Sequence, residues 1–265
     1  MARSVKLRRR QVLASGLALL PLVAGVGGCA YVSRPASIPM RTLSIPAGCA
    51  GPASVLVVFL PGVYSLPQEF IDEGFVAALR DAGVRADVVV ADAHVAYFDD
   101  RSVLDRLQAD VLGPARAAAP ARPIWLVGIS LGAFAALGVL ARRPETIDGA
   151  VLIAPYPGRR PLLQRIVRAG GVAAWARDAA PETPDDLEFD IWSMLAAPGT
   201  ASARPPVYAA YGRADRFANG QQLLASTLPP SQVWTRPGGH DWSVWRPLWS
   251  DWLARGLLPR GCPGR

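Results

Sequence analysis

The chain has 265 residues, of which 51% are hydrophobic and 18% are charged. This composition is far from that of a disordered protein and suffices for one domain with a large core. The formal net charge of +7 arises mainly before Cys29, where five basic residues and no acidic residue occur. The remainder is nearly neutral and has no basic stripe, so we expect one globular domain that does not bind nucleic acid.

Residues 1–28 have the pattern of an export signal. Three arginines precede the apolar run 12–20, which is too short and too rich in glycine for a transmembrane helix. Arg9-Arg10-Gln11-Val12-Leu13 resembles the twin-arginine export motif, and Val26-Gly27-Gly28-Cys29 resembles the lipobox of bacterial lipoproteins. These resemblances imply a protein held on the periplasmic face of a membrane by a lipid on Cys29. The alternative is an ordinary cleaved signal peptide and a periplasmic or secreted protein.

Two more cysteines stand near the ends of the exported chain. Cys49 precedes the first expected strand, and Cys262 lies close to the C-terminus. In an oxidising compartment this pair is expected to form a disulfide that joins the two ends. Residues 29–53 contain many prolines and glycines with little periodicity, which predicts a tether or irregular lead-in.

From residue 54 onward, apolar runs alternate with amphipathic segments. We expect strands at 54–60, 86–91, 123–128, 149–154, 206–211 and 232–235, and helices at 67–82, 101–112, 131–142, 219–227 and 243–255. Continuous apolar runs suit strands covered on both faces, and parallel strands need crossover helices. The sequence therefore predicts an α/β domain over 54–260 with a mostly parallel, doubly wound sheet, interrupted by a cap-like insertion at 156–204.

A serine between two glycines lies where an apolar strand meets an apolar helix. The segment is Gly128-Ile129-Ser130-Leu131-Gly132. A serine held on such a tight turn has a strained backbone, and the residues two before and two after it must be small for the backbones to pass. The free amides at the start of the helix would stabilise a developing oxyanion, with the Leu131 N–H as one donor.

A serine hydroxyl needs a base, and the chain contains only two histidines. His240 lies in a glycine-rich loop between the last strand and the last helix, whereas His94 follows the second strand and is interpreted as a polar loop residue or pocket wall. Asp215 follows the next-to-last strand, where a carboxylate would orient the histidine. Asp241 adjoins His240 and is ranked below Asp215. We therefore expect Ser130, His240 and Asp215 to act together.

The turn after the first expected strand, Phe59-Leu60-Pro61-Gly62-Val63-Tyr64, would supply a second oxyanion donor. The amide of Val63 or that of Tyr64 fills this role. The chain resembles the α/β-hydrolase superfamily, whose members hydrolyse esters, thioesters, amides and related bonds. Four motifs carry the resemblance, in chain order over residues 54–255: Pro61-Gly62-Val63 after a strand, Gly128-Ile129-Ser130-Leu131-Gly132, Gly212-Arg213-Ala214-Asp215 and Gly238-Gly239-His240. Pro61 departs from the family pattern, which usually has a histidine in the position before Gly62.

The resemblance implies acyl transfer through a covalent intermediate on Ser130, with no cofactor and no metal. The expected substrate is a small ester or related acyl compound, and the oligomeric state is left open. Weaker candidates for substrate contact are aromatic or polar residues near the expected site: Tyr64, His94, Tyr97, Trp175 and Trp192. Packing of the insertion onto the sheet is an equal alternative for the two tryptophans. Two rival functions are a non-catalytic lipoprotein with a binding role and an acyltransferase that uses the same three residues.

Overall fold

The computed structural model describes residues 34–197 and 204–262. Within them one sheet has the strand order β1-β3-β2-β4-β5-β6-β7, and β2 through β7 are parallel while β1 runs antiparallel to β3. The strands are β1 Thr42–Ile45, β2 Val55–Leu60, β3 Ala86–Ala91, β4 Ile124–Ile129, β5 Gly149–Ile153, β6 Val207–Gly212 and β7 Val233–Arg236. The predicted α/β class with a mostly parallel sheet is confirmed.

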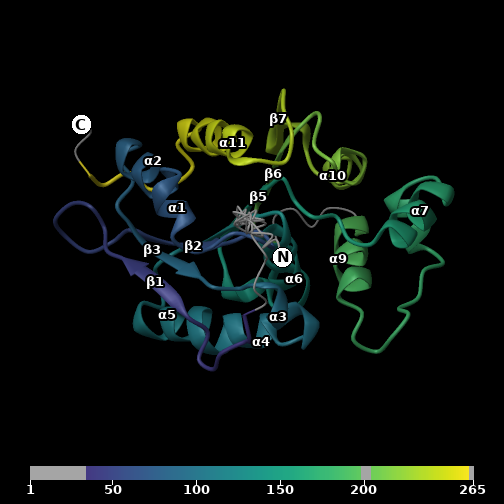
Figure 1. The fold of residues 1–265 in the computed structure, drawn as a ribbon, viewed down its shortest axis with the longest axis horizontal. Helices are drawn as coiled ribbons and strands as arrows, with labels where there is room; N and C mark the ends of the chain where they lie inside the picture. Colours follow the sequence, from purple (N-terminus) through teal and green to yellow (C-terminus); the bar gives the residue numbers. More distant parts are fainter. Residues whose placement is uncertain (1–33, 198–203, 263–265) are drawn as a thin grey trace, which may run out of the picture. The chain divides into compact units, whose positions relative to one another are not determined.

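Helices cover both faces of the sheet (Figure 1). They are α1 Glu69–Asp72, α2 Phe75–Asp81, α3 Val95–Asp99, α4 Val103–Leu107, α5 Gly113–Ala118, α6 Leu131–Arg142, α7 Arg160–Arg168, α8 Val172–Ala176, α9 Leu187–Ala196, α10 Ala218–Ala225 and α11 Trp242–Ala254. The side chains of α2 and α11 belong to the core on one face, and those of α4, α6 and α9 belong to the core on the other. Both faces are covered, which explains why the central strands are apolar throughout.

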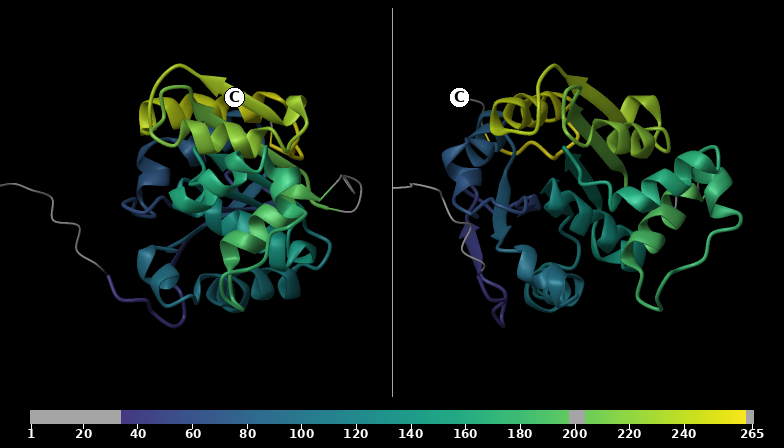
Figure 2. Two further views of the ribbon diagram at one scale, coloured as in Figure 1. Left: turned by 90° about the vertical axis from the view of Figure 1, so that its right-hand side faces the viewer. Right: turned by 45° about the vertical axis from the view of Figure 1, so that its right-hand side comes forward.

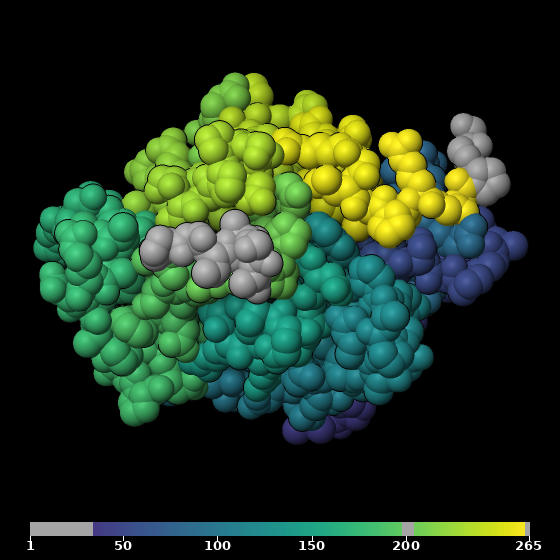
Figure 3. Space-filling view, turned by 180° about the vertical axis from the view of Figure 1, so that it is seen from behind, coloured from purple at the N-terminus to yellow at the C-terminus, as the bar shows by residue number. Residues whose placement is uncertain are grey.

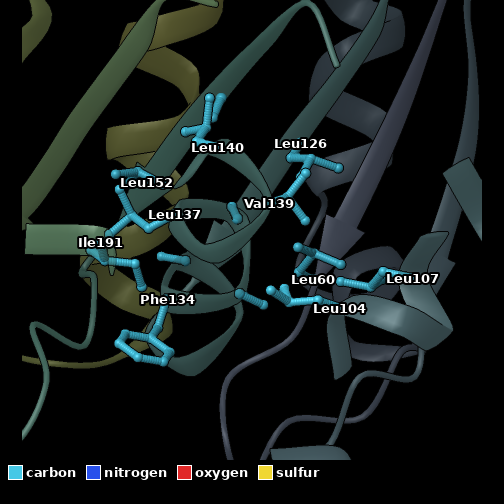
Figure 4. Packing of buried hydrophobic residues seen from close by; sticks show 14 of the residues in the cluster. Leu60, Leu104, Leu107, Leu126, Phe134, Leu137, Val139, Leu140, Leu152 and Ile191 are labelled. Atoms are coloured by element: carbon cyan, nitrogen blue, oxygen red, sulfur yellow. The ribbon is translucent and has the colours of Figure 1, made fainter. Parts of the chain in front are cut away.

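Strand β2 shows how the two cores are divided. Val55, Val57 and Phe59 join the core beneath α2 and α11, whereas Leu56, Val58 and Leu60 join the core beneath α4 and α6. All six residues are buried. Figure 4 shows the second core, in which leucines from the sheet, α4 and α6 pack together and Phe134 stands at the edge of the group.

The tether prediction for 29–53 is wrong at residues 42–45, which form the edge strand β1 and pair with β3. Only Leu43 and Ile45 of this strand pack against the core, so its apolar signal was weak among the neighbouring prolines and glycines. The expected helix 67–82 is likewise divided, because Gly74 takes φ 78° between α1 and α2. The expected helix 101–112 consists of α4 followed by the π-helical turn Gln108–Leu112.

The structure joins Cys49 and Cys262 by a disulfide, with the two Cα atoms 5.7 Å apart. The amide of Cys262 also donates a hydrogen bond to the Gly83 carbonyl at 3.1 Å. Figure 3 shows the C-terminal residues, in yellow, against the purple and blue N-terminal part of the chain. The expected staple between the two ends is therefore present.

The insertion at 156–204 contains α7, α8 and α9 and lies beside the sheet (Figure 2). Helix α9 packs against α6, and its Ile191 and Trp192 are buried in the core. Arg142 at the end of α6 pairs with Asp185 and Asp190 of the insertion, at 2.6 and 2.7 Å. The insertion is therefore a packed part of the domain.

Residues 1–33 lie outside the described part of the chain, and with them the proposed export signal and Cys29. Across residues 34–197 and 204–262, none of the helices has the length and apolar character needed to span a bilayer.

Candidate active site

Ser130 occupies the junction between β4 and α6 with φ 52° and ψ −111°. A positive φ is unusual for a residue with a side chain and costs energy that the surroundings must offset. The Ser130 amide donates to the Ile153 carbonyl at 3.0 Å, and its own carbonyl accepts from the Tyr156 amide at 3.0 Å. These two bonds to the end of β5 and the segment after it hold the strained turn in place.

The two glycines of the motif allow the tight turn. A Cβ atom on Gly128 would lie 2.4 Å from the backbone nitrogen of Ala133, and one on Gly132 would lie 2.0 Å from the Leu60 carbonyl oxygen. Both contacts are with backbone atoms, so no side-chain movement could relieve them. The sequence spacing therefore has the steric origin that was inferred for it.

Ser130, His240 and Asp215 form one hydrogen-bonded line. The His240 Nε2 atom lies 3.0 Å from the Ser130 Oγ, and His240 Nδ1 lies 2.7 Å from Asp215 Oδ2. These residues follow β4, β7 and β6, so three parallel strands present them at the same edge of the sheet. The structure thus brings together the three side chains that the sequence singled out.

Asp215 is buried, and its side chain is fully enclosed. Burial alone would raise the pKa of this carboxyl group, but hydrogen bonds from His240 and from the Phe217 amide outweigh it and lower the pKa. The Phe217 amide donates to Asp215 Oδ1 at 2.8 Å. Asp215 is therefore a carboxylate at neutral pH and holds the proton of His240 on Nδ1.

Gln221 on α10 was not identified from the sequence. It is fully buried, donates to the Pro155 carbonyl at 3.2 Å, and contributes to the lowered pKa of Asp215 through a side-chain hydrogen bond. Gln221 therefore favours the ionised form of Asp215. The only signal in the sequence is that this polar residue falls on the apolar side of a helix.

Two aromatic rings enclose the imidazole. Phe217 and Trp245 each meet the His240 ring edge to face, with ring centres 5.2 and 5.1 Å away. The His240 side chain is consequently 8% exposed. The aromatic contacts restrict its rotation, and only the edge that carries Nε2 faces Ser130.

The turn after β2 lies against the serine. A Cβ atom on Gly62 would be 3.5 Å from the Ser130 Cβ, so the backbone of this turn passes directly beside Ser130. In the part of the chain that the structure describes, the amides of Leu131 and Val63 donate no hydrogen bond. Leu131 adjoins Ser130 at the start of α6, Val63 follows Gly62 in the neighbouring turn, and the Tyr64 side chain is 66% exposed.

The structure does not bring His94 or Tyr97 to Ser130 through any contact in the described residues. His94 is 3% exposed, its ring lies 4.8 Å from that of Tyr97, and its Nδ1 has no hydrogen-bond partner. Burial lowers the pKa of His94, partly opposed by Asp92. The Tyr97 hydroxyl donates to the Ser37 carbonyl at 3.0 Å, so this residue ties the lead-in to α3.

The two tryptophans of the insertion are packing residues. Trp192 is 1% exposed and donates to the Pro157 carbonyl at 3.1 Å. Trp175 meets Phe189 edge to face and lines a cavity of about 360 Å³ within the insertion. A second cavity is lined by Leu131, the residue after Ser130, and neither tryptophan lines it. The structure therefore favours the packing interpretation for both.

Three aromatic residues were missed as candidates for substrate contact: Phe98, Phe134 and Tyr156. They line a cavity together with Leu131. Tyr156 was the most accessible to sequence reasoning, because it follows β5 at the strand edge where ligands bind in parallel sheets. Among the described residues, no group of three or more His, Cys, Asp or Glu side chains could hold a metal ion.

The fold is that of the α/β-hydrolases. S-formylglutathione hydrolase (FrmB) from Staphylococcus aureus superposes with a TM-score of 0.56 at 14% identity, over 84% of this chain and 98% of that protein. A ferulic acid esterase gives 0.54 at 13% identity, over 81% and 95%. The fluorophosphonate-binding serine hydrolase FphF of Staphylococcus aureus gives 0.53 at 12% identity, over 83% and 100%.

The sequence comparisons are more limited. The probable esterase PIR7A of Oryza sativa subsp. indica is 39% identical over 82 residues, which are 30% of this chain and 31% of that protein. The match thus spans about a third of the relative's length. No protein-family model matches the chain.

Proposed function

We propose that this protein is a serine hydrolase that cleaves a carboxylic ester through an acyl-enzyme intermediate. The observation that carries the proposal is the line of two hydrogen bonds, 3.0 and 2.7 Å long, from Ser130 through His240 to Asp215. A serine beside an oriented imidazole is an activated nucleophile, because the imidazole can take its proton during attack. The strained backbone of Ser130 supports a functional role, since strain of this kind clusters at active sites.

In the first half of the reaction, the Ser130 oxygen attacks the ester carbonyl carbon and His240 Nε2 takes the hydroxyl proton. The bond from that carbon to the alcohol oxygen then breaks, and His240 returns the proton to the departing alcohol. In the second half, water attacks the acyl-serine with the same base, and Ser130 regains its proton as the acid leaves. Asp215 remains ionised throughout and stabilises the imidazolium that forms twice.

The negative oxygen of each tetrahedral intermediate would be bound by the amides of Leu131 and Val63. Leu131 begins α6, so the positive end of the helix dipole adds to its N–H group. Removing one donor of this kind typically costs about a hundredfold or more in rate. Ester cleavage is the favoured reaction because the structural neighbours and the matched relative carry esterase and hydrolase names.

The test is to label the protein with a fluorophosphonate and to assay chromogenic esters of increasing chain length. Wild type should be labelled and active, and Ser130→Ala should be neither. Ser226→Ala is the matched control, because Ser226 is exposed on the surface and its hydroxyl only contacts the Leu223 carbonyl. Hydrolysis that persists in Ser130→Ala would remove this serine as nucleophile.

We also propose that the protein is exported and anchored through a lipid on Cys29. The Cys49–Cys262 disulfide supports export, because such bonds persist in oxidising compartments. Growing cells with radioactive palmitate should label the full chain but not a Cys29→Ala variant. Equal labelling of both, or labelling of neither, would contradict the anchor.

A further inference from the structure

A cavity of about 480 Å³ opens beside Leu131 and is here called the Leu131 cavity. Its apolar lining consists of aromatic and aliphatic residues from α3, α4, α6, α9 and the segment after β5: Phe98, Val103, Leu104, Leu131, Phe134, Tyr156 and Leu187. The other lining residues are polar or charged and come mainly from the insertion. The volume falls in the range of small-molecule sites. The cavity is lined by the residue that directly follows the proposed nucleophile. It is therefore a candidate for one of the two substituents of the ester.

An aromatic wall runs from the catalytic histidine into this cavity. The ring of Phe217, which contacts His240, lies 5.5 Å from that of Tyr156. Tyr156 in turn lies 5.6 Å from Phe134, and Phe134 lies 6.5 Å from Phe98. The Tyr156–Phe217 and Phe134–Tyr156 contacts are edge to face, the geometry that aromatic pairs favour.

The position of the Leu131 cavity favours the acyl group over the alcohol group as its occupant. The alcohol oxygen must stay near His240 Nε2, which protonates it as it leaves. The residues that line the Leu131 cavity include neither Ser130 nor the His240 surroundings Phe217 and Trp245, but they include Leu131, whose amide is the proposed donor to the carbonyl oxygen. A substituent that enters this cavity thus extends away from the proton donor, as the acyl group does.

The lining carries five acidic residues and three arginines, and five of these eight charged residues are in ion pairs. Arg142 is paired with acids of the insertion, Arg159 is paired with Glu182 and Glu188, and Asp186 caps the first turn of α9. Asp99 and Arg101 are exposed and opposite in sign. Burial raises the pKa of Tyr156, so its phenol stays neutral. These features favour an uncharged group.

On the basis of the proposed ester hydrolysis, we propose that the Leu131 cavity binds the acyl group and selects one that ends in an aromatic ring. The aromatic wall offers such a ring edge-to-face and stacked contacts that a saturated ring of the same size cannot make. Each well-placed aromatic pair contributes binding free energy beyond that of the buried area. This contribution corresponds to a preference of roughly three- to tenfold for the aromatic ring. The Tyr156 amide donates a hydrogen bond to the Ser130 carbonyl, so the aromatic wall is held in place relative to the proposed nucleophile.

The experiment compares ethyl 3-phenylpropanoate with ethyl 3-cyclohexylpropanoate. The two esters share the alcohol and a saturated acyl chain, so their carbonyl groups are similarly reactive. Wild type should show a kcat/KM ratio of aromatic to saturated ester of roughly three to ten. Tyr156→Leu and Phe98→Leu should each move that ratio toward one. Phe189→Leu is the matched control and should leave the ratio unchanged, because Phe189 packs on Trp175 outside this cavity.

Binding of the free acids gives a second measurement that does not depend on the folding of the Tyr156→Leu and Phe98→Leu variants. In calorimetry, wild type should bind 3-phenylpropanoate more tightly than 3-cyclohexylpropanoate, and Ser130→Ala should show the same preference. A ratio at or below one in wild type, or a ratio that Tyr156→Leu leaves unchanged, would overturn the aromatic preference and leave the hydrolase assignment intact. Failure of wild type to hydrolyse any ester or to react with the fluorophosphonate would overturn the hydrolase proposal instead.

Discussion

Replacing Gly132 with alanine tests whether close packing of α6 on β2 maintains the active-site turn. An alanine Cβ would lie 2.0 Å from the Leu60 carbonyl oxygen and 2.7 Å from that of Pro61, so α6 and the β2 turn must separate by about 1 Å to relieve the overlap. Overpacking of this kind costs about 1–3 kcal/mol of unfolding free energy, and the backbone contacts place Gly132→Ala at the upper end. For a chain of this size that lowers the melting temperature by about 5–10 °C.

The same movement shifts Ser130 and the Leu131 amide relative to Val63, and misplacement by about 1 Å lowers turnover on the order of a hundredfold. Thermal denaturation and the kcat of a chromogenic ester measure the two effects. Gly138→Ala is the control on the same helix, because its Cβ would meet only flexible leucine side chains at 3.1 and 3.2 Å. Alanine also favours a helix by about 1 kcal/mol over glycine. Gly132→Ala that melts and turns over like Gly138→Ala would refute the reasoning.

Three further predictions concern the carboxylate, the disulfide and the buried histidine. Asp215→Asn should lower kcat in an ester assay by about 10⁴ because it favours the wrong tautomer of the imidazole, whereas Asp241→Asn should act like wild type because asparagine still caps α11. Replacing Cys49 and Cys262 with serine should lower the unfolding free energy in urea by up to about 5 kcal/mol, since the bond spans 213 residues. A loss under about 1 kcal/mol would contradict that entropic estimate. Burial lowers the pKa of His94 below 6.5, so its stabilising effect is full above pH 6.5 and declines as pH falls. The melting temperature of His94→Gln should therefore rise relative to that of wild type when the pH falls from 7 to 5. A difference in melting temperature that stays constant over this range would show that the lowered pKa of His94 does not affect stability.

The sheet and the positions of the three site residues could be predicted because both follow from short, local patterns. The expected strand at 86–91 agrees with β3, and α6 begins and ends as expected at Leu131 and Arg142. The order of strands then requires loops after β4, β6 and β7 to meet at one edge, which places Ser130, Asp215 and His240 near one another. The edge strand β1 was missed because it is short and half exposed.

The aromatic wall could not be predicted, since it depends on how separate segments pack. Phe98, Phe134, Tyr156 and Phe217 come from α3, α6 and the loops after β5 and β6, and each has an ordinary local context in the sequence. Whether their rings meet is decided by the rotation of α6 and by the packing of the insertion. The same limitation applies to His94, whose loop position gave no sign that it is almost fully buried.

The structure separates the parts proposed to determine turnover from those proposed to determine specificity, and Tyr156 belongs to both. Its backbone amide binds the Ser130 carbonyl and helps hold the strained turn, whereas its ring belongs to the aromatic wall. A substitution that changes only the ring keeps the amide and should thus alter the choice of acyl group more than the rate of the chemical step. Changes to the backbone around residue 156 would also move Ser130. The backbone path of the insertion's first residues is therefore constrained by the position of Ser130, whereas the more distant helices of the insertion are freer to vary.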